Sequence, residues 1–168
     1  SVMPDLPDAV LLVVGDGPER AALAQLVQHL QLADRVIFTG MVSPADVPRY
    51  YALADAFVSA SASEAQGLTY LEALAAGLPL LCRDDPCLND LVQQGQNGYV
   101  WQNPAQLVRL SHTLLYRDDP DVLRKNAVAS ARPYSSAAFA AAAEQLYRRE
   151  ILRKTQQRQI LRREVVLL

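Results

Sequence analysis

Residues 59–79 read SASASEAQGLTYLEALAAGLP, and this order predicts a strand end, a loop, a helix and the start of a second strand. The small polar residues follow an apolar run, which indicates that the chain leaves a strand. Apolar residues then recur at helical spacing, and Gly77 and Pro79 lie where a helix would stop. A strand, a helix and a further strand form the repeating unit of a parallel sheet.

Two carboxylates lie within this stretch, Glu64 in the loop and Glu72 about one turn into the helix. A helix N-terminus presents unpaired N–H groups and a partial positive charge, which favours a bound phosphate. Gly67 has no Cβ and lets a ligand approach the backbone. Together these features suit a sugar nucleotide, with one carboxylate on each side of the diphosphate. A second interpretation is open, in which Thr69 and Glu72 form a capping box and Glu64 is a solvated loop residue.

Strand and helix patterns alternate along the rest of the chain. Strands are expected at residues 9–14, 35–39, 56–58, 78–82 and just before Trp101. The unbroken apolar run at residues 9–14 is typical of a strand that is buried on both faces. Helices are expected to begin at Pro18, near Ser43, at Asn103-Pro104, at Asp119-Pro120 and at Ser135.

This alternation predicts a Rossmann-like α/β fold, with one parallel sheet that carries helices on both faces. Ligands of such sheets bind at the carboxyl ends of the strands. The loops at residues 15–17, 40–42, 59–69 and 83–86 are expected to converge at that edge.

Three motifs in register resemble those of retaining glycosyltransferases of family 4, also called group 1, whose architecture of two Rossmann domains is known as GT-B. They are Val13-Val-Gly-Asp-Gly-Pro18, Arg35-Val-Ile-Phe-Thr-Gly40 and the pair Glu64 and Glu72 with seven residues between them. The resemblance runs from about Val10 to about Arg149 and is to the C-terminal, donor-binding domain. Gln66 stands where the family usually has an aromatic residue, and this variant looks most like bacterial glucosyltransferases that make glucosyl-diacylglycerols.

The resemblance implies transfer of a hexose, expected to be glucose from UDP-glucose, to a lipid or glycan acceptor with retention at the anomeric carbon. Glu64 would contact the donor sugar as the catalytic residue, and Glu72 would contact the ribose. The remaining donor-binding residues would be Gln66, Gly67, Leu68 and Thr69 at the diphosphate, Met41 and Val42 at the base, and Gly15 and Gly17 in a loop that faces the crevice. A plain strand-to-helix turn explains Gly15 and Gly17 at least equally well. Neither a cofactor nor a metal is expected, because the helix end and basic side chains would stabilise the departing diphosphate.

The resemblance also implies parts that this chain of 168 residues does not contain. Residues 1–150 are expected to form the nucleotide-sugar-binding domain without its first strand, whose loop would carry an Arg and a Lys. An N-terminal, acceptor-binding domain would be the missing partner. We therefore expect the chain by itself to be inactive.

Residues 151–168 form the predicted tail, and basic residues outnumber acidic ones from Arg148 onward. The tail fits a helix on an anionic lipid surface, and it also fits a solvated helix that packs on the missing domain.

The net charge of −2 gives no indication of a nucleic-acid partner. Two cysteines are too few for a disulfide framework, which favours the cytoplasm, with association at the inner face of the membrane if the lipid interpretation holds.

Two other classes of function remain open. A non-catalytic, nucleotide-binding Rossmann module would keep Gly67 but tolerate loss of Glu64. An epimerase or phosphorylase of the same architecture would also bind sugar nucleotides or sugar phosphates. A phosphorylase would need a cofactor lysine, whereas Lys125 and Lys154 fall in late helices. A dinucleotide dehydrogenase is disfavoured because Gly15 and Gly17 are not followed by a third glycine at the fingerprint spacing.

Overall fold

The computed structural model describes residues 2–61 and 67–165, with side chains up to residue 158 in the last helix. The chain divides into two compact units, Ser1–Ser130 and Ala131–Leu168. A short 3-10 helix, η1 (Met3–Asp5), precedes the first strand of the first unit.

The first sheet consists of β1 (Leu11–Val14) and β2 (Val36–Gly40), which are parallel and connected through α1 (Arg20–His29). Pro18 lies two residues before α1, so the prediction that the helix begins at this proline is wrong. The prediction that the first strand is buried on both faces is also wrong. Leu11 is 38% exposed and Val14 is 41% exposed in this strand, which forms a two-stranded sheet with β2 in the described part of the chain.

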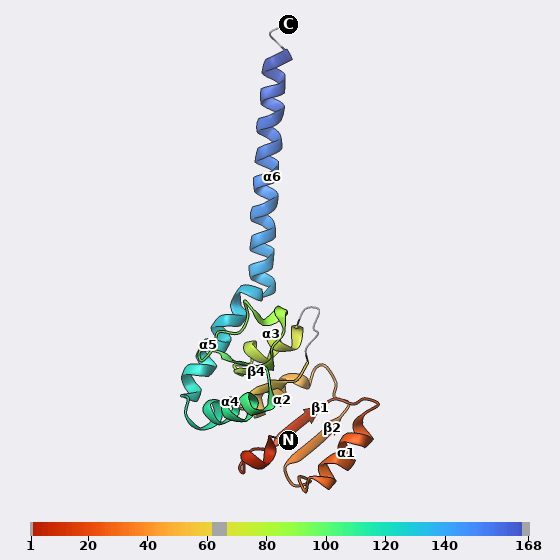
Figure 1. Ribbon diagram of the computed structural model, residues 1–168. Coiled ribbons are helices and arrows are strands. Elements are labelled where there is room, and N and C mark those ends of the chain that lie inside the picture. The colour runs from red at the N-terminus through yellow and green to blue at the C-terminus, as the bar shows by residue number, and fades with distance from the viewer. Residues whose placement is uncertain (1, 62–66, 166–168) are drawn as a thin grey trace. The chain divides into compact units, whose positions relative to one another are not determined.

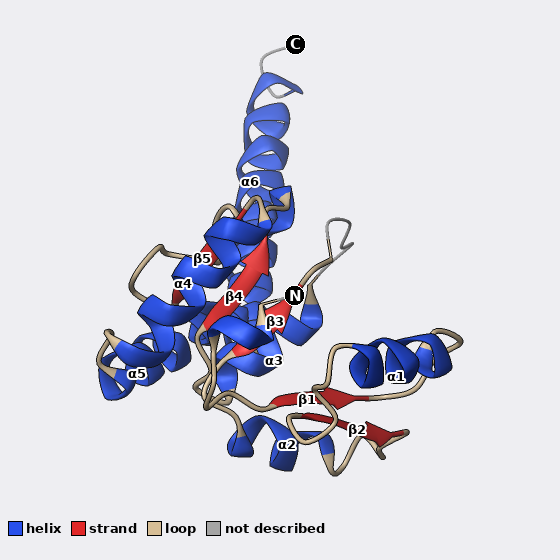
Figure 2. Ribbon diagram, turned by 60° about the horizontal axis from the view of Figure 1, so that its bottom comes forward, coloured by secondary structure: helices blue, strands red, loops and turns tan. Residues whose placement is uncertain are grey.

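The second sheet has the order β3 (Phe57–Ser59), β4 (Leu80–Arg83), β5 (Gly98–Trp101), all parallel (Figure 2). Between β3 and β4 runs α3 (Leu68–Ala75), and the short η2 (Pro86–Leu88) follows β4. The central strand β4 is buried as its apolar sequence predicts, with Leu80 and Cys82 fully covered. Gly98 allows β5 to approach this strand, since a Cβ there would collide with the Leu80 backbone.

Two helices cover the second sheet, α4 (Pro104–Tyr116) and α5 (Pro120–Ala131) (Figure 1). Both start where a cap residue precedes a proline. Asn103 Oδ1 accepts a hydrogen bond from Gln106 N at 3.0 Å, and Asp119 Oδ1 accepts one from Asp121 N at 3.0 Å. The core beneath them is formed by Leu81, Trp101, Leu110, Leu114 and Leu123.

The predicted fold class, α/β with parallel strands and helices, is confirmed, but the strands form two sheets instead of one. The sheets are linked in sequence by α2 (Val47–Leu53), which follows β2 and leads into β3. Ser43 Oγ donates to Asp46 Oδ2 at 2.7 Å just before α2, where a helix start was predicted.

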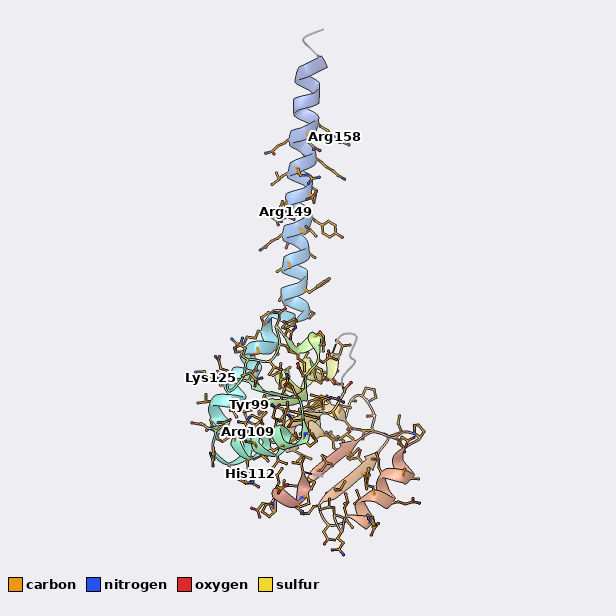
Figure 3. All side chains as sticks on the ribbon, viewed as in Figure 1. Tyr99, Arg109, His112, Lys125, Arg149 and Arg158 are labelled. Atoms are coloured by element: carbon orange, nitrogen blue, oxygen red, sulfur yellow. The ribbon has the colours of Figure 1, made fainter. Side chains whose placement is uncertain are left out.

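The second unit consists of a short 3-10 helix, η3 (Arg132–Tyr134), and α6 (Ser136–Val165). The side chains described in α6 are exposed or half-buried, among them the basic residues Arg149 and Arg158 (Figure 3). The domain boundary predicted at residue 150 falls inside this continuous helix. Among the residues that the structure describes, no helix combines the length and the hydropathy needed to cross a membrane.

Candidate functional site

The N-terminus of α3 begins at Gly67, which adopts a left-handed backbone with φ of 57°. A Cβ at this position would lie 2.7 Å from Tyr70 Cδ2, closer than real side chains allow. Glycine has no side chain to cap the helix, and none of the described side chains makes a hydrogen bond that caps it. Leu68 and Thr69 of the first turn are both exposed, and the N–H groups of a first helical turn are of the kind that bind anions.

The carboxylate of Glu72 is not used to cap this helix. Thr69 is the second residue of α3 and not its N-cap, so the capping-box interpretation is wrong. Instead, Tyr51 Oη on α2 donates to Glu72 Oε2 at 3.1 Å. Burial and the neighbouring Glu72 carboxylate raise the pKa of Tyr51 to about 12, so its hydroxyl is protonated at neutral pH.

Three aromatic residues, Tyr51, Phe57 and Tyr70, pack together next to Glu72 and Gly67. We call them the aromatic cluster. The ring centroids of Tyr51 and Phe57 are 6.1 Å apart, and those of Phe57 and Tyr70 are 5.9 Å apart with an edge-to-face arrangement. Tyr70 Oη lies 3.1 Å from Ser59 Oγ, which also accepts a hydrogen bond from Ser61 N. Sequence reasoning missed this cluster because its members come from two helices and a strand.

The other predicted site residues lie at the carboxyl ends of β1 and β2. Gly15 N donates to Gly40 O at 3.1 Å, and both glycines have positive φ. Gly17 N donates to Asp16 Oδ1, and this bond, followed by that from Arg20, lowers the pKa of Asp16. Beyond β2, Met41 is 80% exposed and Val42 is half-buried.

The structure thus arranges the predicted residues in two groups. Gly15, Gly17, Met41 and Val42 lie at the end of the first sheet, whereas Gly67, Leu68, Thr69 and Glu72 lie beside the second. Glu64 and Gln66 are outside the described residues. The helix α2 joins the groups along the chain, since it follows the first group and its Tyr51 contacts Glu72 in the second.

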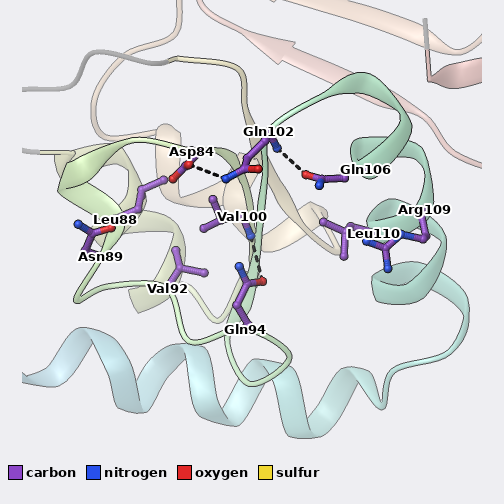
Figure 4. A pocket seen from close by; sticks show the side chains of 10 residues that line it. All are labelled: Asp84, Leu88, Asn89, Val92, Gln94, Val100, Gln102, Gln106, Arg109 and Leu110. Carbon is purple, nitrogen blue, oxygen red and sulfur yellow. Dashed lines mark hydrogen bonds between the residues drawn. The ribbon is translucent and has the colours of Figure 1, made fainter.

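A cavity of about 530 Å³ lies elsewhere, between η2, β5 and α4 (Figure 4). Gln94 Oε1 accepts from Val100 N, and Gln106 Oε1 accepts from Gln102 N, so glutamine side chains cover N–H groups along the outer edge of the sheet. Such covering protects an edge strand from pairing with other chains. Of the described residues in the predicted loops, Asp84 in residues 83–86 is the one that lines this cavity. We therefore place the candidate site at the start of α3.

A family model and two relatives of known name all indicate a glycosyl transferase. The model of the family "Glycosyl transferases group 1" matches residues 1–132. An alpha-monoglucosyldiacylglycerol synthase of Acholeplasma laidlawii is 37% identical over 144 residues, which cover 84% of this chain and 36% of that protein. The protein of the same name from Streptococcus pneumoniae is 45% identical over 97 residues, which cover 58% of this chain and 22% of that protein.

A solved structure shares the fold. The pneumococcal O-GlcNAc transferase GtfA, in complex with UDP and GlcNAc, aligns with a TM-score of 0.76 at 21% identity, over 86% of this chain and 30% of that one. The matched part of the chain thus spans 36% of the length of the first of these synthases and 22% of the second. From the extent of the family match we conclude that the chain belongs to the group 1 family of glycosyl transferases.

Proposed function

We propose that this chain is the donor-binding part of a retaining hexosyltransferase that transfers glucose from UDP-glucose to a diacylglycerol lipid. The observation that carries the proposal is the N-terminus of α3 at Gly67, which no described side chain caps, with the exposed carboxylate of Glu72 about 7 Å further along the helix. The names of the two synthases support glucose as the sugar and diacylglycerol as the acceptor.

In this proposal the N–H groups of the first turn of α3 bind the diphosphate of the donor. Charge grows on the diphosphate as the glycosidic bond breaks, and backbone donors that are already oriented stabilise it without reorganisation. Glu72 accepts hydrogen bonds from the ribose hydroxyls. Glu64 contacts the sugar, and Met41 and Val42 contact the base. No metal is required, since the helix end and basic side chains balance the negative charge.

We further propose that one strand absent from this chain belongs to the domain and joins the two sheets. Among the described strands, β1 and β3 each pair with a single neighbour, so one edge of each is unpaired there. Apolar side chains around the first sheet are exposed, such as Val10, Leu26 and Ile37. The acceptor would bind to the part of the protein that precedes this chain, and the enzyme would act at the cytoplasmic face of the membrane.

The proposal is tested by titrating the full-length protein with UDP, GDP and ADP in a calorimeter, and by following labelled UDP-glucose in the presence of diacylglycerol. We expect binding of UDP alone, binding at least tenfold weaker in Glu72→Ala, and an α-linked glucolipid product by NMR. Nucleotide binding without transfer would support the non-catalytic module instead. Conversion of UDP-glucose to an isomer would support the epimerase.

A further inference from the structure

The carboxylate of Glu72 is held by a neutral donor and not by a cation. Within residues 2–61 and 67–158, its hydrogen bond from Tyr51 is its sole side-chain partner, and it takes part in no ion pair. The bond connects α2 with α3 across 21 residues of sequence. Because it engages Oε2, the second oxygen, Oε1, is left to accept hydrogen bonds from a ligand.

The hydroxyl of Tyr51 is itself fixed in place. Its ring packs against Phe57 of β3, which packs edge-to-face on Tyr70 of α3. Tyr70 is 1% exposed and lies against Gly67, the residue that starts α3. The aromatic cluster thereby connects the start of α3, the end of β3 and the carboxylate of Glu72 in one packed group.

We propose that Tyr51 is a positioning residue that orients the Glu72 carboxylate toward the ribose hydroxyls of the nucleotide. A glutamate on an exposed helix face samples several rotamers, and binding selects one of them. The bond from Tyr51 restricts the carboxylate before the ligand arrives, which lowers the entropy lost on binding. This inference rests on the proposed function, since it requires Glu72 to contact the nucleotide.

The proposal is specific to the hydroxyl group of Tyr51. Phenylalanine at this position keeps the ring and its contact with Phe57 but removes the hydrogen bond. Tyr50, the adjacent residue of α2, is half-buried, and none of the described hydrogen bonds involves its hydroxyl, so Tyr50→Phe is the matched control.

The test is a double-mutant cycle on the full-length protein with Tyr51→Phe, Glu72→Ala and the combination of both, each titrated with UDP and with 2′,3′-dideoxy-UDP. We expect Tyr51→Phe to weaken UDP binding by about two- to tenfold, which corresponds to the roughly 0.5–1.5 kcal/mol lost when one more side chain is immobilised on binding. The same change should have no effect in the Glu72→Ala background or on dideoxy-UDP. Tyr50→Phe should bind UDP like the unchanged protein, and all variants should unfold within a few degrees of it.

Three results would overturn the proposal. Unchanged UDP affinity in Tyr51→Phe would show that Glu72 needs no positioning, while the proposed function would stand. An equal loss in the Glu72→Ala background, or for dideoxy-UDP, would show that Tyr51 acts through packing. Failure of the unchanged protein to bind UDP would overturn the proposed nucleotide site and this inference with it.

Discussion

At the scale of single residues, Asn97 shows how a buried amide holds the turn before β5. Its Nδ2 donates to Leu91 O at 2.9 Å and to Ser130 Oγ at 2.8 Å, and its Oδ1 accepts from Gln93 N at 2.7 Å. The side chain is fully buried. Both polar atoms of the amide thus have partners, which is the condition for burying a polar group without a large penalty.

Asn97→Ala should lower the free energy of unfolding by about 2–3 kcal/mol, because the change leaves Gln93 N–H and Leu91 C=O without their partner. Urea unfolding followed by circular dichroism measures this difference. The control is Asn126→Ala, which removes one exposed bond to Gln96 O and should cost less than about 0.5 kcal/mol. Equal effects of the two changes would contradict the assigned role of Asn97.

Gly67→Ala should destabilise the protein by roughly 2–4 kcal/mol, since alanine is disfavoured at φ of 57° and its Cβ would collide with Tyr70. The control is Gly17→Ala, because Gly17 has no positive φ and a Cβ there would meet no atom within 4 Å. We expect the control to change the free energy of unfolding by less than about 1 kcal/mol. A Gly67→Ala protein as stable as the control would show that the helix start can rearrange.

At the scale of elements, the cap-and-proline signals of α4 and α5 predicted helix starts correctly, whereas the proline before α1 and the contacts between distant residues were not predicted correctly. Asn103 and Asp119 act on amides two or three residues away, so the starts of α4 and α5 could be predicted from cap and proline alone. The hydrogen-bond partner of Glu72 is Tyr51, which lies 21 residues earlier in the chain. The spacing between Thr69 and Glu72 predicts a capping box instead. The exposure of β1 was also beyond prediction, because an apolar run indicates what a strand could bury and not which neighbours it has.

The contact between β5 and the turn after α4 should respond to alkaline pH. Tyr99 Oη donates to Asp118 Oδ2 at 2.8 Å, and burial together with this carboxylate raises the pKa of Tyr99 from 10 to about 12. A pKa that is higher in the folded state gives stability that is fully present below pH 10 and is lost as the pH rises toward 12. The stability difference between the unchanged protein and Tyr99→Phe should therefore be constant from pH 7 to 9 and shrink above pH 10. Unfolding experiments at each pH measure it, and a difference that persists at pH 12 would contradict the assignment.

At the scale of the whole molecule, three of the four outer edges of the two sheets, those of β1, β3 and β5, differ in how their backbone groups are protected. At the outer edge of β5, Gln94 Oε1 accepts a hydrogen bond from Val100 N of the strand, and Gln106 Oε1 accepts one from Gln102 N just beyond it. In β1, Leu11 N bonds to the β2 side, so the backbone groups of Leu12 face the free edge. In β3, Phe57 N bonds to the β4 side, so those of Val58 face the free edge in the same way. No described side chain covers either edge, which is the pattern expected if a further strand pairs with both.

A longer chain that includes the proposed strand should therefore be more stable than residues 1–168. A strand between β1 and β3 would satisfy both edges and cover exposed apolar residues such as Leu11, which adds both hydrogen bonds and apolar burial. We expect the amides of Leu12 and Val58 to exchange at least a hundredfold more slowly in the extended chain than in residues 1–168, as measured by NMR hydrogen exchange. The amide of Val100, already bonded to Gln94, serves as the internal control, because its hydrogen bond is present in both chains. Equal slowing at all three amides would indicate a general gain in stability, whereas selective slowing at Leu12 and Val58 would place the added strand between the two sheets.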